Sequence, residues 1–529
     1  MDINYPDSNN NLIDIFQVLL NIVNKKLQIP NLDNFKFKEF QGFLESPYEI
    51  LSDNGLYKKH LTSFISSFDN IVLVGTGGSS LGAKSLVEIC SVKARHYFYY
   101  ANSTNEHEIL KLKNKLDLTK TGFLISSKSG STVEVISLFR YFYNEIEKNA
   151  EFNTAGSHFI AITESGSLLD TISNKHNFHT TIHTASSLVG RFSVFSPFGT
   201  CLAYMAGVSL TNIATGALSC LESIQKYDSE NQVLTLTNFI LEAIKSGKDK
   251  LVILPSKSLY PFALWIEQLI AESLGKKAKG IIPVIKDNYD EREQFSKDSM
   301  VIFLRNETSS ELNNLIKGNH SQVMDFLITS DTELAFEMMK WQLATVAIGT
   351  VMNINPFNQP QVELSKNLAS EFINNSQFEK DLFDKNGSEE DCIIALFKSI
   401  ESSDYVCLLN YVNESPEIIN ELRDISLTIS EILRIPCTVY NGPSYLHSTG
   451  QLHKGGPNTG VFIQFLSKES KSNTVIPQKK YTFDKLFISQ ADGDFTALSN
   501  LDRRICRIDI GIDLLGDLKR FHRLIKHRI

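Results

Sequence analysis

The sequence has few cysteines, and none is arranged as a zinc site or a disulfide framework requires. Seven cysteines occur among 529 residues, and no two of them form a Cys-x-x-Cys pair. Scattered cysteines within apolar runs predict free thiols in a reducing compartment. The sequence also lacks an apolar run of membrane-spanning length, and its first residues show no basic and apolar segments of a secretory signal. We therefore expect a cytoplasmic protein.

An excess of positive charge is absent as well. The formal net charge is −8 at pH 7. Nucleic acids and membrane surfaces are bound by basic faces, so we expect neither as a partner. A small anionic ligand remains compatible with this charge, because a few local donors are enough to bind it. The hydrophobic content of 42% and the charged content of 21% are ordinary for a globular protein.

What the sequence does contain is two series of short apolar runs that alternate with helical patterns. Strands of the first series are expected at 71–75, 96–100, 122–127 and 158–163. Those of the second are expected at 251–254, 281–285, 301–304, 405–409, 437–440 and 460–465. Such alternation predicts an α/β fold with doubly wound parallel sheets and helices on both faces.

The length favours two or three domains. We predict an N-terminal helical arm at 1–45, a first doubly wound domain at 46–230 and a second at 231–475. Residues 476–529 are expected to form a C-terminal tail that contains a helix, a strand and a basic final helix.

Two polar turns follow strands of the first series. One contains Gly75, Gly77, Gly78 and Gly82, and the other runs from Ser126 through Lys128 to Thr132 before a helix begins. Free backbone N–H groups, the positive end of the helix dipole, hydroxyl groups and one ammonium suit a phosphate monoester. The second turn by itself fits a structural helix cap equally well, and the first turn tips the balance towards a phosphate site.

The glycine turn does not match the common nucleotide sites. No Gly-Lys-Ser/Thr follows at the spacing of a P-loop. A dinucleotide site would also place a carboxylate at the end of the next strand, which instead ends Tyr99-Tyr100-Ala101-Asn102. Two hydroxyl-lined turns favour a sugar phosphate over NAD or ATP.

Five segments resemble a known family. The turns at 75–82 and 127–134 resemble the signatures of sugar-isomerase (SIS) domains. Val189-Gly-Arg-Phe-Ser193, Glu267-Gln-Leu-Ile-Ala-Glu-Ser-Leu-Gly-Lys276 and Asn355-Pro-Phe-Asn-Gln-Pro-Gln-Val-Glu-Leu-Ser-Lys366 resemble motifs of the glucose-6-phosphate isomerase family. The resemblance covers about 60–470, and its last part looks like the isomerase portion of bacterial transaldolase–isomerase fusions. It implies two SIS-type subdomains, an aldose–ketose isomerase of glycolysis and gluconeogenesis, and a homodimer.

The resemblance also implies roles for individual residues. Glu272 would be the base that moves a proton between C2 and C1, and Arg191 would stabilise the enediolate. Lys366 would assist ring opening, and Gln359 would contact a substrate hydroxyl. The phosphate and the sugar would be bound by the remaining matched residues: Gly78, Ser79, Ser127, Lys128, Ser129 and Thr132.

The histidine that opens the sugar ring is less well defined. Leu446-His447-Ser-Thr-Gly-Gln451 resembles the family's histidine segment, but it follows the lysine motif, whereas in most bacterial members it follows the glutamate motif. We assign His447 to ring opening, with His453 as the alternative. We expect no cofactor and no metal, since no set of His, Asp and Glu has ligand spacing.

Two other functions are compatible with the motifs. One is a different phosphosugar enzyme with paired SIS domains, such as a glucosamine-6-phosphate-forming isomerase domain. The other is a non-catalytic phosphosugar-binding regulator, which would not need Glu272, Arg191 and Lys366 together. Their joint presence favours an enzyme, although the sequence leaves open whether epimers such as mannose 6-phosphate are also substrates.

Overall fold

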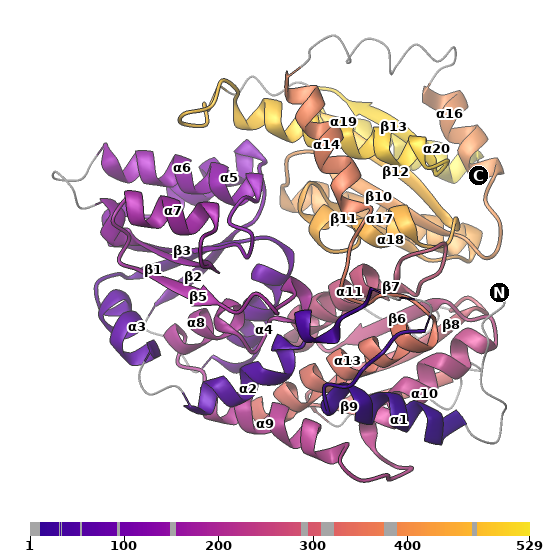
Figure 1. Cartoon of the computed structure of the whole chain (residues 1–529). Helices are drawn as coiled ribbons and strands as arrows, with labels where there is room; N and C mark the ends of the chain where they lie inside the picture. Colours follow the sequence, from indigo (N-terminus) through magenta and orange to yellow (C-terminus); the bar gives the residue numbers. More distant parts are fainter. Residues whose placement is uncertain are drawn as a thin grey trace.

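Three parallel sheets, rather than the two expected, form the centre of the molecule (Figure 1). The computed structural model describes residues 11–528 except 31, 33, 53–55, 92–95, 149–154, 287–294, 308–321, 375–388 and 468–472. Every strand pair in the described part is parallel, and helices lie on both faces, which confirms the predicted α/β class. The second predicted series of strands is divided between two sheets, because the helices after β9 carry the chain away before β10 begins.

The first sheet has the order β2-β1-β3-β4-β5. Its strands are β1 (Asn70–Val74), β2 (Tyr97–Ala101), β3 (Thr121–Ser126), β4 (Phe159–Glu164) and β5 (Thr180–Thr184). Its helices are α3 (Leu56–Ser66), α4 (Leu81–Cys90), α5 (Glu106–Lys115), α6 (Val133–Glu147), α7 (Leu168–Lys175), α8 (Pro197–Met205) and α9 (Leu210–Ser223). The central strands β1 and β3 are apolar runs because both of their faces are buried.

The second sheet has the order β7-β6-β8-β9. It consists of β6 (Lys250–Pro255), β7 (Ile282–Ile285), β8 (Ser299–Arg305) and β9 (Gln322–Leu327), with helices α10 (Gln232–Lys245), α11 (Tyr260–Leu274) and α13 (Asp331–Val351). Helix α13 is buried on nearly all sides, and it packs against α9, α10 and α11. One apolar core therefore runs from the first sheet into the second.

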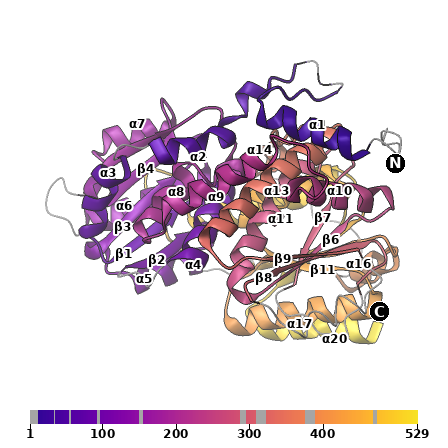
Figure 2. The same ribbon diagram turned by 90° about the horizontal axis from the view of Figure 1, so that it is seen from below.

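The third sheet, of order β11-β10-β12-β13, includes much of the predicted tail. Its strands are β10 (Tyr405–Tyr411), β11 (Cys437–Asn441), β12 (Gly460–Ser467) and β13 (Arg504–Ile510). The neighbouring helices are α14 (Val362–Asn374), α16 (Glu389–Lys398), α17 (Pro416–Leu433), α18 (Gly450–Gly455), α19 (Phe483–Asn500) and α20 (Leu514–Arg528). Strand β13 pairs with β12, and α20 packs beside α17 (Figure 2), so these residues complete a layered unit.

The N-terminal arm does not stand apart from the rest of the chain. Helix α1 (Asn11–Val23) packs on α10 and α13, and α2 (Gly42–Ser52) packs on α9 (Figure 1). Apolar residues of α1 such as Leu19 and Ile22 are fully buried there. In the part of the chain that the structure describes, no helix is both long and apolar enough to span a membrane.

Candidate active site

The predicted phosphate turn lies between β3 and α6. Ser127 and Thr132 close it, with 3.0 Å between their hydroxyl oxygens, and the Ser131 backbone N–H donates to Ser129 Oγ at 3.3 Å. Ser129, Ser131 and Thr132 line a cavity of about 500 Å³, which we call the substrate cavity. Helix α6 begins at the wall of the substrate cavity. Backbone N–H groups and hydroxyl groups therefore lie close together where an anion would bind.

The Lys128 side chain contacts residues outside the substrate cavity. Its ammonium lies 3.2 Å from a Glu164 carboxylate oxygen and donates to the Ser186 carbonyl at 3.2 Å. It does not line the substrate cavity. Of the residues predicted to bind the phosphate, Ser129 and Thr132 line this cavity directly. Ser127 supports Thr132 through its hydroxyl.

The glycine turn fits between two other parts of the site. It contains η2 (Gly77–Ser79), and Gly77 has φ +52°. A Cβ on Gly77 would lie 2.4 Å from the His447 carbonyl oxygen, and one on Gly78 would lie 2.1 Å from the Gly190 carbonyl carbon. Only glycine permits approaches this close. The Ser126 hydroxyl donates a hydrogen bond to the Ser79 carbonyl at 2.8 Å, which joins the two turns.

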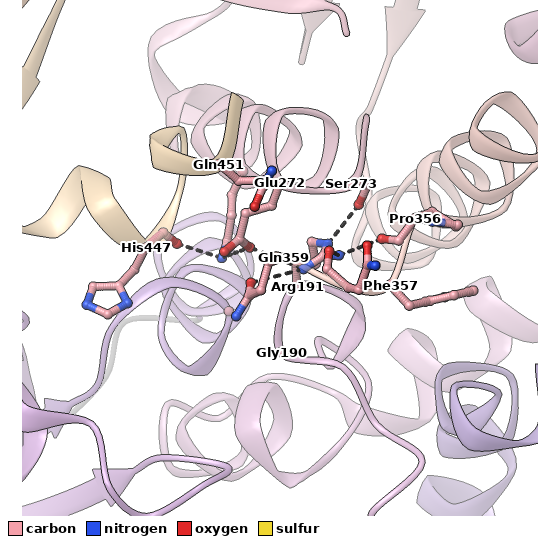
Figure 3. A network of polar contacts seen from close by, with 12 residues as sticks. Gly190, Arg191, Glu272, Ser273, Pro356, Phe357, Gln359, His447 and Gln451 are labelled. Atoms are coloured by element: carbon pink, nitrogen blue, oxygen red, sulfur yellow. Dashed lines mark hydrogen bonds and ion pairs between the residues drawn. The ribbon is translucent and has the colours of Figure 1, made fainter. Parts of the chain in front are cut away.

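Arg191 is fixed by hydrogen bonds on several sides (Figure 3). It belongs to η5 (Gly190–Phe192) and is only 2% exposed. Its Nε donates to Ser273 Oγ at 2.8 Å, and a terminal nitrogen donates to Gln359 Oε1 at 3.3 Å. The other terminal nitrogen donates to the carbonyls of Pro356 and Asn358, at 2.5 and 3.1 Å. The structure thus joins predicted Arg191 and Gln359.

Glu272 faces this arginine from α11. Its carboxylate lies 3.7 Å from Arg191 and accepts a hydrogen bond from Gln268 at 3.0 Å. Burial raises the pKa of Glu272, and the positive charge of Arg191 offsets part of that rise. A carboxylate with a raised pKa beside a fixed guanidinium has the properties of a general base next to an anion-stabilising group.

Lys276 supports the same cluster from one turn further along the chain, a role that sequence reasoning missed. Its buried ammonium donates to the Ser273 carbonyl at 2.8 Å and to the Asn355 carbonyl at 2.7 Å. Burial, and then the charge of Arg191, holds the pKa of Lys276 well below its usual range. Its place in the matched Glu-Ser-Leu-Gly-Lys segment is the signal that could have drawn attention to it.

A second acid–base pair, His447 with Glu134, lies at the substrate cavity. His447 ends η7 (Ser444–His447), and its Nε2 is 2.9 Å from Glu134 Oε1. Although burial acts to raise the pKa of Glu134, the charge and hydrogen bond of His447 hold it at about 2. Glu134 also accepts from Gln490 at 2.7 Å. Sequence reasoning missed Glu134, because a carboxylate in a first helical turn also suits the helix dipole alone.

The two acid–base groups are connected through Gln268, which donates to both the Glu272 carboxylate and the His447 carbonyl. The His447 ring points away from Arg191 and Glu272 (Figure 3). Lys366 is exposed on α14 and lines the substrate cavity with His447, Ser129 and Thr132.

His453 has a different environment. It is 2% exposed, lies 3.2 Å from the Tyr405 hydroxyl, and contacts the rings of Tyr440 and Phe462. Burial places the pKa of His453 well below its usual range. These surroundings are those of a core histidine. Within the described residues, no group of three or more His, Cys, Asp or Glu side chains is placed to hold a metal ion.

Comparisons with known proteins find similar sequences. Residues 54–286 match the family model described as phosphoglucose isomerase. A probable glucose-6-phosphate isomerase of Methanococcus maripaludis is 27% identical over 68% of this chain and 93% of its own length. The glucose-6-phosphate isomerase of Methanocaldococcus jannaschii is 27% identical over 60% of this chain and 88% of its own length.

Solved structures share the fold. A hypothetical protein from Thermus thermophilus has a TM-score of 0.58 at 20% identity, covering 68% of this chain and 94% of that one. A glucose-6-phosphate isomerase from Chlamydia trachomatis has a TM-score of 0.57 at 18% identity, covering 73% and 87%. Residues 54–286 therefore resemble the phosphoglucose isomerase family model, and the chain is similar to glucose-6-phosphate isomerases in sequence and shares their fold.

Proposed function

We propose that this protein is a glucose-6-phosphate isomerase, which interconverts glucose 6-phosphate and fructose 6-phosphate in glycolysis and gluconeogenesis. One observation carries the proposal: the Glu272–Arg191 pair and the His447–Glu134 pair are held together by Gln268, beside a phosphate turn. The isomerisation needs one group to open the sugar ring and another to move a proton between neighbouring carbons. The relatives named glucose-6-phosphate isomerase support this substrate.

The substrate phosphate would bind at the N-terminus of α6. Ser129 and Thr132 would donate their hydroxyls there, and Ser127 would hold Thr132. Lys366, which lines the same cavity as His447, would reach the sugar from α14 and assist ring opening. The Lys128 charge would act from a greater distance. Gly78 and Ser79 would approach the sugar through the backbone, because η2 lies between the Arg191 and His447 segments.

The chemistry would then proceed in two stages. His447, with Glu134 behind its ring, would exchange a proton with the ring oxygen and the C1 hydroxyl so that the ring opens. Glu272 would next take the C2 proton and return it to C1. The negative charge that develops on the enediolate oxygen would be stabilised by Arg191, whose guanidinium is already oriented by its hydrogen bonds. Gln359 would contact a substrate hydroxyl.

We also propose that the protein acts in the cytoplasm as a homodimer. A coupled assay tests the central proposal: purified protein should convert fructose 6-phosphate to glucose 6-phosphate without added metal. Activity that EDTA abolishes and zinc or manganese restores would contradict it. So would specific binding of fructose 6-phosphate without any turnover, which is the behaviour of a regulator.

A further inference from the structure

A second cavity lies at the carboxyl ends of β2, β10 and β11. Its volume is about 430 Å³, within the range of small-molecule sites. One wall comes from residues 99–105 and α5, and the other from residues 412, 414 and 441–444. We call it the β2 cavity. Carboxyl ends of parallel strands are where ligands bind in such sheets, and the proposed isomerisation does not use this cavity.

The side chains of the β2 cavity carry both charges and many hydrogen-bonding groups. Lys84, Lys111 and Lys115 contribute ammonium groups, and Glu108 and Glu414 contribute carboxylates. Two of these lysines form long ion pairs, Lys111 with Glu108 and Lys84 with Glu88, each at 3.9 Å. Lys84 and Lys115 also lie over the rings of Tyr100 and Tyr99. Polar residues surround them: Tyr99, Tyr100, Asn102, Ser103, Asn105, Asn441 and Ser444. This set suits a ligand that has an anionic group and several hydroxyls.

Two polar atoms in the cavity wall have unsatisfied hydrogen-bonding capacity. The Tyr100 hydroxyl and Glu108 Oε1 are buried and form no hydrogen bond among the described residues, although Glu108 Oε1 lies 3.9 Å from the Lys111 ammonium. A buried polar atom without a hydrogen-bond partner destabilises the folded state, because its lost contacts with water are not replaced. The Tyr100 hydroxyl can donate a hydrogen bond and Glu108 Oε1 can accept one. Hydroxyl groups of a ligand in this cavity could form both of these hydrogen bonds. Burial, and then the charge of Glu108, also raises the pKa of Glu414.

Both partners of the His447–Glu134 pair are connected to the wall of the β2 cavity. Thr104, between cavity residues Ser103 and Asn105, donates to Gln490 at 2.6 Å, and Gln490 donates to Glu134 at 2.7 Å. On the other wall, Ser444 begins η7, the segment that ends at His447. A ligand in the β2 cavity would therefore affect both Glu134 and His447, through a contiguous network of contacts.

We propose that the β2 cavity is an effector site for a small phosphorylated polyhydroxy compound, and that its occupation changes ring opening at His447. The lysines bind the phosphate, and Tyr100 and Glu108 bind hydroxyls. The shared chemistry is a phosphate on a sugar that also carries a vicinal diol, which a free sugar phosphate and a nucleotide both offer. The regulatory part rests on the proposed isomerase function, whereas the binding part does not.

Calorimetry tests the binding part with two probes, ribose 5-phosphate and adenosine 5′-monophosphate. Lys111→Gln with Lys115→Gln should weaken binding by about tenfold or more, because each lysine that contacts the phosphate would lose a charge-assisted hydrogen bond. Both lysines are exposed, so the variant should fold normally. Ser127→Ala with Thr132→Ala in the substrate cavity should leave the affinity unchanged. Exposed Lys120→Gln with Lys175→Gln, outside the cavity, is the matched charge control.

The pattern of binding decides the outcome. Binding of either probe that only the cavity variant weakens supports the site, and the preferred probe shows whether the free sugar phosphate or the nucleotide is the source. No binding of either probe, or binding that only the Ser127→Ala, Thr132→Ala variant weakens, overturns the proposal. These results do not depend on isomerase activity, so they separate failure of the site from failure of the proposed function.

Kinetics tests the coupling with the probe that binds. A saturating probe should change turnover of glucose 6-phosphate by about fivefold or more, as for ordinary allosteric coupling. It should not affect a four-carbon aldose phosphate, which cannot form the pyranose. Thr104→Val should retain probe binding and lose most of the effect, because the bridge to Gln490 is broken. Equal effects on both substrates would overturn the coupling to ring opening.

Discussion

At the scale of single residues, the environment of Glu272 accounts for its proposed role. An exposed helical glutamate would be ionised and well solvated, and so a weak base. Glu272 is 5% exposed, and its carboxylate lies 3.7 Å from the Arg191 guanidinium. Burial raises the pKa of Glu272, and the charge of Arg191 limits that rise, so the side chain can still ionise. A base that works near neutral pH needs this balance.

Replacing Glu272 by glutamine should therefore remove proton transfer and preserve binding. The amide keeps the shape and can still hydrogen-bond with Gln268, but it cannot accept the C2 proton. Turnover should fall by roughly 100-fold to 10,000-fold, the range of general base catalysis. Steady-state kinetics measures the loss, and calorimetry with a phosphosugar inhibitor should show nearly unchanged affinity. A variant with more than a tenth of the wild-type turnover would exclude Glu272 as the base.

Glu267 allows a prediction of how stability depends on pH. Burial raises its pKa to about 8, against a hydrogen bond from Tyr440 at 2.9 Å that acts to lower it. The folded state therefore binds a proton that the unfolded state releases above its ordinary pKa of about 4.3. Stability should fall as pH rises from about 4.3 to 8, and Glu267→Gln should flatten this part of the profile. Urea unfolding at several pH values measures the slope; an unchanged slope would contradict the assignment.

At the scale of elements, the turn between β3 and α6 provides a test of phosphate binding. Ser127→Ala with Thr132→Ala removes both partners of one hydrogen bond, so no hydroxyl is left unpaired between them. Each lost charge-assisted bond to phosphate should cost about 1.5–3 kcal/mol of affinity. Some of the loss should appear in turnover, because remote binding energy helps to orient the sugar. Inhibition constants of a phosphosugar analogue provide the measurement, and unchanged constants would reject the site.

Elements with strong local patterns could be predicted from the sequence. The apolar runs of β1 and β3, followed by polar turns, are buried central strands with the turns at their carboxyl ends. The division into three sheets could not be predicted in this way, because strand pairing depends on contacts between distant residues. Strand β13 shows this limit: its helix–strand–helix pattern was evident, but its pairing with β12 was not. The predicted domain boundaries and the resemblance to transaldolase–isomerase fusions stay predictions.

The candidate site shows the same division between local and long-range information. Arg191, Glu272 and Gln359 lie in matched motifs, and the structure brings them together. Glu134, Gln268 and Lys276 received no role beforehand, because their importance comes from partners far along the chain. Lys128 lies in a matched motif, yet the carboxylate of Glu164 holds it away from the cavity. A motif predicts which residue is present, and packing determines where its side chain points.

At the scale of the whole molecule, ring opening depends on how the first and third sheets meet. Glu134 belongs to a helix of the first sheet, whereas His447 follows β11 of the third, and their contact joins residues 313 positions apart. His453, six residues further along, is packed into the third sheet's aromatic core instead. The segment that follows β11 thus places one histidine, at the end of η7, at the substrate cavity and another, in α18, in the interior. The two make a matched pair for mutagenesis.

His447→Ala should be impaired on glucose 6-phosphate and should retain isomerisation of a four-carbon aldose phosphate, which is always open-chain. The loss on the cyclic sugar should be about 100-fold or more, as expected for a missing acid–base group. His453→Ala should instead lower the thermal midpoint, because it leaves a cavity among aromatic rings, and its remaining folded fraction should treat both substrates alike. Kinetics on the two substrates, with unfolding curves for both variants, separates these effects. If His447→Ala loses equal activity on the cyclic and the open-chain substrates, His447 does not open the ring. If His447→Ala is fully active while His453→Ala is folded but inactive, the ring-opening role belongs to His453.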